Sequence, residues 1–208
     1  MDVYEAIQKR MTIRDFADRP VPEEIMQKII SAGFLAPTNN HMRDWHFIFL
    51  NDRNKREELL TQTIKPVSRK SAINIVNRWQ MKDESQRDMY IDAIPKQTSM
   101  LLTCGCLVIP CYRQEINILK PKSLSDLNGL ASIWLVIENI LLAAAAEGIF
   151  GVTRIPMDRE RQAIKDYCHI PLAYDIPCWL ALGYPKDGAV RTRQVTINPS
   201  ERIHHDTW

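Results

Sequence analysis

The hydrophobic positions of the chain follow two different periods. Apolar residues from Ile25 to Ala32 repeat at the spacing of one helix face, and Pro37 predicts the end of this helix. Apolar runs, which are typical of buried strands, occupy residues 46–50, 106–111 and 179–182, and residues 149–153 predict a short strand or an extended loop. Strands that mix with long helices in this way predict an α+β sandwich.

Short polar signals predict where further helices begin and end. Asp2 stands three residues before a glutamate, the spacing of a capping box for a first helix. Ser125 or Asp126 is expected to cap a long helix that Gly148 ends. Asp158 is expected to cap another helix that ends near the fourth cysteine.

Two long segments lack such clear ends. Residues 133–146 are very apolar, but they contain Glu138 and Asn139 and are shorter than the roughly 20 residues that a membrane span needs. We therefore expect a central buried helix and no membrane partner. Residues 65–100 are mostly polar and helical in pattern, with breaks at two prolines.

The composition limits the class of protein. A length of 208 residues suits one domain over residues 1–208, and a hydrophobic fraction of 45% supports a packed core. There are 27 basic and 25 acidic residues, which leaves a net charge of +2. This balance does not favour a general nucleic-acid surface, so no nucleic-acid partner is predicted.

The cysteines are expected to be free thiols. Their number is odd and no pair has the spacing of a zinc site, so neither disulfides nor a metal site is predicted. Free cysteine packs as a small apolar residue, and unpaired thiols fit a reducing cytoplasm. The five are Cys104, Cys106, Cys111, Cys168 and Cys178.

Two short segments carry the most informative chemistry. In residues 10–14, Arg10 and Arg14 flank Thr12, and on a helix the two arginines would share a face. Guanidinium groups match the geometry of phosphate, and a hydroxyl can complete the cradle. Residues 36–45 form a polar turn before a strand, which can bring hydrogen-bond groups to a flat heterocycle. Together they predict a site for a phosphate-bearing cofactor.

The order of these segments resembles the FMN-dependent nitroreductase superfamily. Its members carry a basic R-x-S-x-R element, an A-P-S-x-x-N-x-Q-P-W turn, a Q-N-x-x-L-A-A helix, a Gly-Tyr-Pro and a closing basic pair. The matching segments here are residues 10–14, 36–45, 138–148, 183–185 and 191–193. The match covers nearly the whole chain in the same order.

The resemblance implies a fold and an assembly. It implies an α+β, three-layer sandwich in which helices flank a mixed, mainly antiparallel sheet. It also implies a homodimer with FMN at the interface. Residues 190–208 would then form a C-terminal arm that embraces the other subunit.

The basic segments at the two chain ends are implied to hold FMN. Arg10 and Arg193 would bind the phosphate together with Arg191, and Thr12 keeps the hydroxyl of the family's serine. Arg14 would face the ribityl chain or the pyrimidine edge of the ring. A cation there would stabilise the negative charge of reduced flavin.

The turn and the segment after residue 148 are implied to approach the flavin ring. The turn usually reaches a flavin that the partner subunit holds, and His41 replaces the usual asparagine, as in the deiodinase-like branch. Ile155 would offer a backbone N–H near flavin N5, but it lacks the hydroxyl of that branch. The implied cofactor contacts are Arg10, Met11, Thr12, Arg14, Pro37, Thr38, Asn39, His41, Thr153, Arg154, Ile155, Arg191 and Arg193.

These residues favour an FMN-dependent oxidoreductase. NADH or NADPH would reduce the flavin, and a nitroaromatic, quinone, enone or flavin acceptor would then use the same site in a ping-pong mechanism. No protein nucleophile is predicted, and no G-x-G-x-x-G nicotinamide fingerprint occurs, so the flavin would carry the chemistry with Arg14 in support.

Two alternatives remain open. A specialised relative, such as a reductive dehalogenase or a flavin-fragmenting enzyme, is favoured by His41, whereas Ile155 argues against dehalogenation. A flavin-binding protein without turnover is favoured by Arg43 and Asp44, which depart from the family's turn, and by the unusual residues 65–100.

Overall fold

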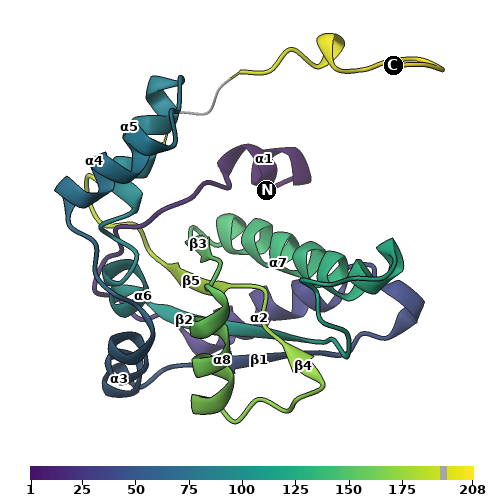
Figure 1. Ribbon diagram of the computed structural model, residues 1–208, viewed down its shortest axis with the longest axis horizontal. Helices are drawn as coiled ribbons and strands as arrows, with labels where there is room; N and C mark the ends of the chain where they lie inside the picture. The colour runs from purple at the N-terminus through teal and green to yellow at the C-terminus, as the bar shows by residue number, and fades with distance from the viewer. Residues whose placement is uncertain (193–195) are drawn as a thin grey trace.

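The computed structural model describes residues 1–192 and 196–208 and has mixed helix and strand structure (Figure 1). Its α-helices are α1 (Val3–Lys9), α2 (Glu23–Phe34), α3 (Arg53–Thr63), α4 (Arg69–Arg78), α5 (Glu84–Ala93), α6 (Ser99–Thr103), α7 (Asn128–Ala146) and α8 (Asp158–Tyr167). The strands are β1 (Trp45–Phe49), β2 (Cys106–Arg113), β3 (Phe150–Arg154), β4 (Tyr174–Asp175) and β5 (Trp179–Gly183). Short 3-10 turns are η1 (Asn39–His41), η2 (Leu124–Leu127) and η3 (Pro199–Glu201).

The strands form one sheet in the order β1-β2-β5-β3, and β4 pairs with the end of β2. All of these pairings are antiparallel. A parallel bridge between Thr12 and Gly151 adds the N-terminal segment beside β3. The expected mainly antiparallel sheet is therefore confirmed, and β4 is a short strand that the hydrophobic pattern did not predict.

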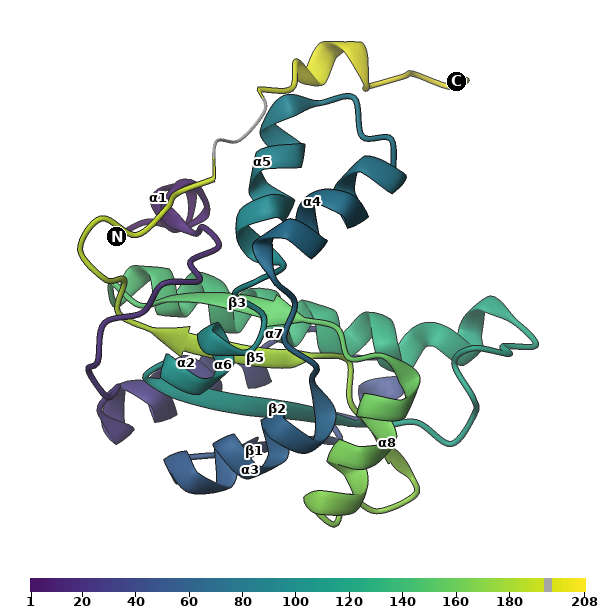
Figure 2. The ribbon, with the colours of Figure 1, turned by 60° about the vertical axis from the view of Figure 1, so that its left-hand side comes forward.

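Helices cover both faces of the sheet, as Figure 2 shows for α7 on one side and α3 and α8 on the other. Alternate residues of β2 point to opposite faces. Val108 packs with Ile29 of α2 and Ile137 of α7, whereas Leu107 packs in the cluster that includes Leu59 of α3. The arrangement of a sheet between helical layers agrees with the predicted α+β sandwich.

The central helix α7 is the longest helix of the fold and packs across α2 and the sheet. By length and composition, Leu124–Ala146 could span a membrane, but here one face of α7 belongs to the core. The helices cross at Gly33, where a Cβ would lie 2.8 Å from Ile140 Cγ1. Gly148 ends α7 with a φ of +74°, a conformation that glycine adopts without strain.

The predicted helix ends were right at some places and wrong at others. Asp2 does form the expected capping box on α1. Ser125 and Asp126 do not cap α7, because they lie within η2 and α7 begins at Asn128. Asp158 is the first residue of α8 rather than its cap, because the Glu160 carboxylate accepts the Met157 N–H at this end.

Residues 65–100 form a helical hairpin that projects from the body beside the N-terminal segment (Figures 1 and 2). Its helices α4 and α5 share a small apolar cluster of Ala72, Val76 and Ile94. A break after Trp79, which the sequence did not predict, separates α4 from α5. The hairpin therefore has its own apolar contacts and joins the body at its base.

The cysteines are free thiols, as expected, and four of the five are buried. Burial raises the pKa of the Cys106 thiol to about 11 and that of Cys104 to about 12. These thiols are therefore neutral at physiological pH and pack as apolar groups.

Candidate cofactor site

The segment from Arg10 to Phe16 is extended rather than helical. Arg10 caps the end of α1, Thr12 bridges to Gly151, and Phe16 bridges to Pro185. Arg10 and Arg14 follow the helix, so the face that they would share on a helix does not form. In extended backbone, residues two positions apart lie on the same side, which places Arg10, Thr12 and Arg14 opposite the fully buried Ile13.

Arg14 is a half-buried cation with few partners. Its Nη2 donates to the Met89 thioether at 3.6 Å, and it forms no ion pair with any residue that the structure describes. Burial lowers the pKa of its guanidinium, and the negative charges of Asp92 and Asp15 oppose this effect. A thioether is a weak acceptor, so most of the donors of this guanidinium remain for a ligand.

Arg10 forms a long and partly exposed ion pair. Its Nε lies 3.5 Å from Glu138 Oε1 on α7, and both side chains are partly exposed, at 31% and 51%. An exposed ion pair of this kind contributes little to stability. Arg10 can therefore turn from Glu138 to a bound phosphate.

At the end of β3, the side chain of Arg154 is fully engaged. Its Nη1 and Nη2 donate to the two Glu160 oxygens at 2.8 and 3.0 Å, and its Nε donates to Gln97 Oε1 at 3.1 Å. Arg154 and Glu160 are buried. A cofactor contact at this position would come from the backbone. Ile155, the next residue, is 70% exposed.

The chain after β5 returns to the N-terminal segment. The Ala17 N–H donates to the Tyr184 carbonyl at 2.9 Å, and the Lys186 N–H donates to the Asp15 carbonyl at 3.0 Å. Arg191 follows this pairing and is exposed. Arg193, the other predicted phosphate ligand of this end, lies outside the described residues.

The polar turn before β1 has an unusual backbone. Asn40, His41 and Arg43 all have positive φ, between 46° and 54°. Side chains are uncommon in this region, and such strain often marks a functional segment. The turn is anchored to α7, because the Asn39 N–H donates to Ser132 Oγ at 3.1 Å. His41 itself is exposed.

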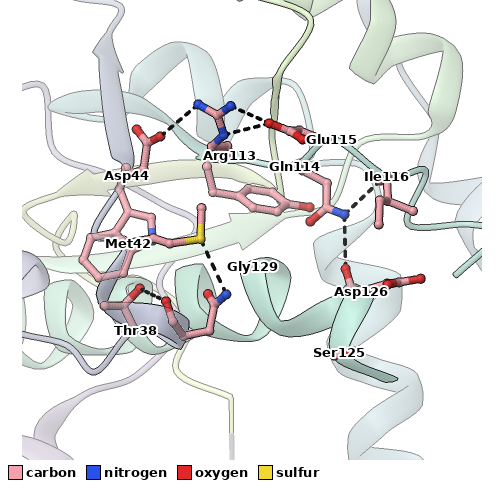
Figure 3. A pocket seen from close by; sticks show the side chains of 13 residues that line it. Thr38, Met42, Asp44, Arg113, Gln114, Glu115, Ile116, Ser125, Asp126 and Gly129 are labelled. Carbon is pink, nitrogen blue, oxygen red and sulfur yellow. Dashed lines mark hydrogen bonds and ion pairs between the residues drawn. The ribbon is translucent and has the colours of Figure 1, made fainter. Parts of the chain in front are cut away.

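A pocket of about 290 Å³ opens beside this turn (Figure 3). In Figure 3, the Arg113 guanidinium lies between the carboxylates of Asp44 and Glu115. Asp44 also accepts the Tyr174 hydroxyl at 2.7 Å. The pocket is lined by Thr38, Asn39, Met42, Asp44, Trp45, Tyr112, Arg113, Gln114, Glu115, Ile116, Ser125, Asp126 and Gly129.

Sequence reasoning missed several residues that organise these segments. Asp44 was seen only as a departure from the family's turn, but it ties β1 to β4 through Tyr174. Glu160 and Gln97 were not singled out, although they hold Arg154. The sequence signal for Glu160 is a glutamate in the first turn of a polar helix. This signal is equally typical of an ordinary helix cap, so it does not indicate the partner of Arg154.

The turn and the arginine segment, which carry the predicted cofactor contacts, touch different parts of α7. The turn meets Ser132 and the arginine segment meets Glu138, six positions later. Six residues correspond to about 9 Å along a helix and roughly 240° around it. Within one chain, the turn and the arginine segment therefore form two separate half-sites.

The antiparallel sandwich, with the arginine segment beside β3, defines the protein as one of the α+β class. The description of the family that matches is "Nitroreductase family", and the match spans residues 7–184. The chain therefore belongs to the nitroreductase family.

Individual relatives agree with this assignment. A protein of Methanothermobacter thermautotrophicus named "Putative NADH dehydrogenase/NAD(P)H nitroreductase" is 44% identical over 100% of this chain and 88% of its own length. The fold is similar to that of an iodotyrosine deiodinase bound to FMN and 3-iodo-L-tyrosine, with a TM-score of 0.73, 16% identity and 100% of both chains covered. It is also similar to that of an NADPH:FMN oxidoreductase from Vibrio harveyi in complex with NAD+, with a TM-score of 0.66, 17% identity, and 99% and 77% covered.

Proposed function

We propose that this protein is an FMN-dependent oxidoreductase that takes electrons from NADH or NADPH and gives them to a small-molecule acceptor. The observation that carries the proposal is Arg14, a half-buried guanidinium without an ion pair among the described residues, on the segment that also bears Arg10 and Thr12. A cation held in this way fits an anionic ligand better than a structural role.

The residues present fit FMN in charge and in donor type. Arg10 would hold the phosphate with Arg191 and Arg193, and Thr12 would add a hydroxyl. Arg14 would lie against the polar edge of the ring. The backbone after Arg154 would supply an N–H donor, because the Arg154 side chain is engaged with Glu160. Each of these contacts is a charge-assisted or neutral hydrogen bond to an oxygen or nitrogen atom.

When bound, FMN would supply the hydride chemistry. The protein would orient it and favour the charge that develops on reduction, which is the role proposed for Arg14. No side chain needs to act as a nucleophile. The reductant and the acceptor would use one open face in turn, and a nitroaromatic, quinone, enone or flavin is the proposed class of acceptor.

We further propose a homodimer with FMN at its interface. The two half-sites of one chain support this idea, because a second copy could bring its turn of residues 37–41 to the arginine segment. The exposed residues 196–208 would form an arm around the partner. A cytoplasmic location is part of the proposal and agrees with the free thiols.

Reductive dehalogenation is the second candidate, favoured by the fold similarity to a deiodinase and by His41. Against it stands Ile155, whose exposed side chain carries no hydroxyl. The two functions differ in substrate, so parallel assays with a nitroaromatic and a halotyrosine separate them.

Anaerobic titration of the purified, FMN-loaded protein tests the proposed function. We expect the yellow protein to bleach with NADH or NADPH and to regain colour when an acceptor is added. Steady-state rates over both substrates should give parallel double-reciprocal lines. Protein that binds FMN but never bleaches would contradict turnover, and intersecting lines would contradict the shared site.

A further inference from the structure

The base of the α4–α5 hairpin contacts both segments that are proposed to meet the cofactor. Lys96 Nζ lies 2.7 Å from Asp15 Oδ2, on the segment that carries Arg14. The neighbouring Gln97 accepts the Arg154 Nε–H at the end of β3. The hairpin is therefore joined to the site by polar contacts at its base, whereas its apolar cluster lies within the hairpin itself.

Lys96 holds two carboxylates at once. Its Nζ lies 2.7 Å from Asp15 and 2.8 Å from Asp92, and all three side chains are between 24% and 31% exposed. Partial burial lowers the pKa of Lys96, but its hydrogen bonds to Asp15 and Asp92 outweigh this effect and leave the pKa above its ordinary value. The ammonium group is therefore fully charged at neutral pH.

Asp15 follows Arg14 directly in the chain, and Asp15 and Asp92 both act electrostatically on the Arg14 guanidinium. Their negative charges oppose the effect of burial on the Arg14 pKa. Arg14 nevertheless forms no ion pair with them, and its Nη2 contacts Met89 instead. Without Lys96, two half-buried carboxylates would lack a partner, and Arg14 would be the nearby cation able to neutralise them.

We propose that Lys96 is a positioning residue, which neutralises Asp15 and Asp92 and so leaves Arg14 available for an anionic group of the cofactor. The inference rests on the proposed function, because it takes FMN as the ligand of Arg14. Loss of Lys96 would let the carboxylates capture the guanidinium. Removal of one carboxylate would then leave a single acid near Arg14 and weaken this capture.

The test uses the dissociation constant of FMN for apoprotein, measured by flavin fluorescence, and the reduction potential of the loaded protein. The variants are Lys96→Met, Lys96→Gln, Lys96→Arg and the double variant Lys96→Met/Asp92→Asn. Lys28→Met is the matched control, because Lys28 forms an exposed ion pair with Glu147 away from this site. Circular dichroism checks that each variant folds. If Lys96→Met does not fold, Lys96→Gln takes its place in the comparison.

We expect Lys96→Met to weaken FMN binding about ten-fold and to lower the reduction potential of the bound flavin. The dissociation constants of Lys96→Arg and Lys28→Met should stay within about two-fold of the wild-type value. The double variant should recover part of the affinity, because one carboxylate instead of two can then compete for Arg14. Wild-type affinity in folded Lys96→Met, or no recovery in the double variant, would overturn the inference. Wild-type protein without affinity for FMN would instead overturn the proposed function, and the inference with it.

Discussion

Two neighbouring regions of this protein differ in how an arginine side chain is paired. At the end of β3, Arg154 is buried and both of its terminal nitrogens are paired with Glu160. In the adjacent N-terminal segment, Arg14 is half-buried and has a thioether as its hydrogen-bond partner among the described residues. The two segments are linked through the Thr12–Gly151 bridge, so they lie next to each other at the β3 edge of the sheet.

The difference separates a structural cation from one that is available to a ligand. A buried ion pair with additional hydrogen bonds fixes local geometry, and removing one partner leaves an uncompensated charge. An arginine that is held in place without a carboxylate partner can instead bind an anionic ligand. The first kind should affect folding and the second should affect cofactor binding and reduction.

The largest effect is expected from breaking the buried pair. Glu160→Gln should lower the free energy of unfolding by about 3–5 kcal/mol, because Arg154 would remain buried without a carboxylate. Chemical denaturation of the apoprotein measures the change. Asp158→Asn, which alters a carboxylate 70% exposed beside Arg161, is the control and should change stability by less than about 0.5 kcal/mol. Equal effects of the two variants would remove the distinction between the regions.

The second effect is expected on the rate of flavin reduction. Arg14→Ala should raise the barrier by about 2.7 kcal/mol, the lower end for removal of one preorganised donor, which corresponds to roughly 100-fold. Stopped-flow reduction of the FMN-loaded protein measures it, with the exposed Arg69→Ala variant on α4 as the control. An unchanged rate would reject the role given to Arg14. A large loss of folding stability would place Arg14 in the same class as Arg154.

The third effect concerns affinity rather than rate. Arg10→Ala should weaken FMN binding by roughly ten- to a hundred-fold, because a charge-assisted hydrogen bond contributes about 1.5–3 kcal/mol. Riboflavin binding should change much less, since riboflavin lacks the phosphate. Parallel losses for both ligands would mean that Arg10 supports the fold or the ring instead.

The smallest effect is a pH dependence that arises from a buried thiol of β2 and not from either arginine. Burial raises the pKa of the Cys106 thiol to about 11, above the ordinary value of 9.0. The folded state therefore keeps its proton while the unfolded state loses it, so stability is complete below about pH 9 and falls as the pH rises toward 11. Thermal unfolding from pH 7 to 10.5 measures this, and Cys106→Ala should flatten the decline. The same decline in Arg14→Ala would show that the thiols act independently of the cation.

The sequence predicted the α+β class, three of the strands, the start of α1 and the end of α2, because their signals are local, and it left residues 149–153 open between a strand and a loop. It did not predict β4, which is two residues long and depends on pairing with Arg113 and Tyr112. The spacing of Arg10 and Arg14 fits one face of a helix, but a spacing of four cannot reveal that the segment is extended and bridges to Gly151.

The candidate site could be predicted in part for the same reason. Motif order marked the arginine segment and the turn, but it did not reveal which arginine has a protein partner. Arg154 and Arg14 are equivalent in a sequence, and in the fold they are distinguished by Glu160, an acid six residues after Arg154 on the next helix. The link from Lys96 to Asp15 joins residues 81 positions apart, and no local pattern records it.

The most direct test of the central claim compares FMN with riboflavin on wild-type apoprotein by calorimetric titration. The account predicts one FMN per protomer, bound roughly 100-fold more tightly than riboflavin, because Arg10 forms a partly exposed ion pair with Glu138 and can turn from it to the phosphate that riboflavin lacks. Equal affinities for the two ligands would contradict it.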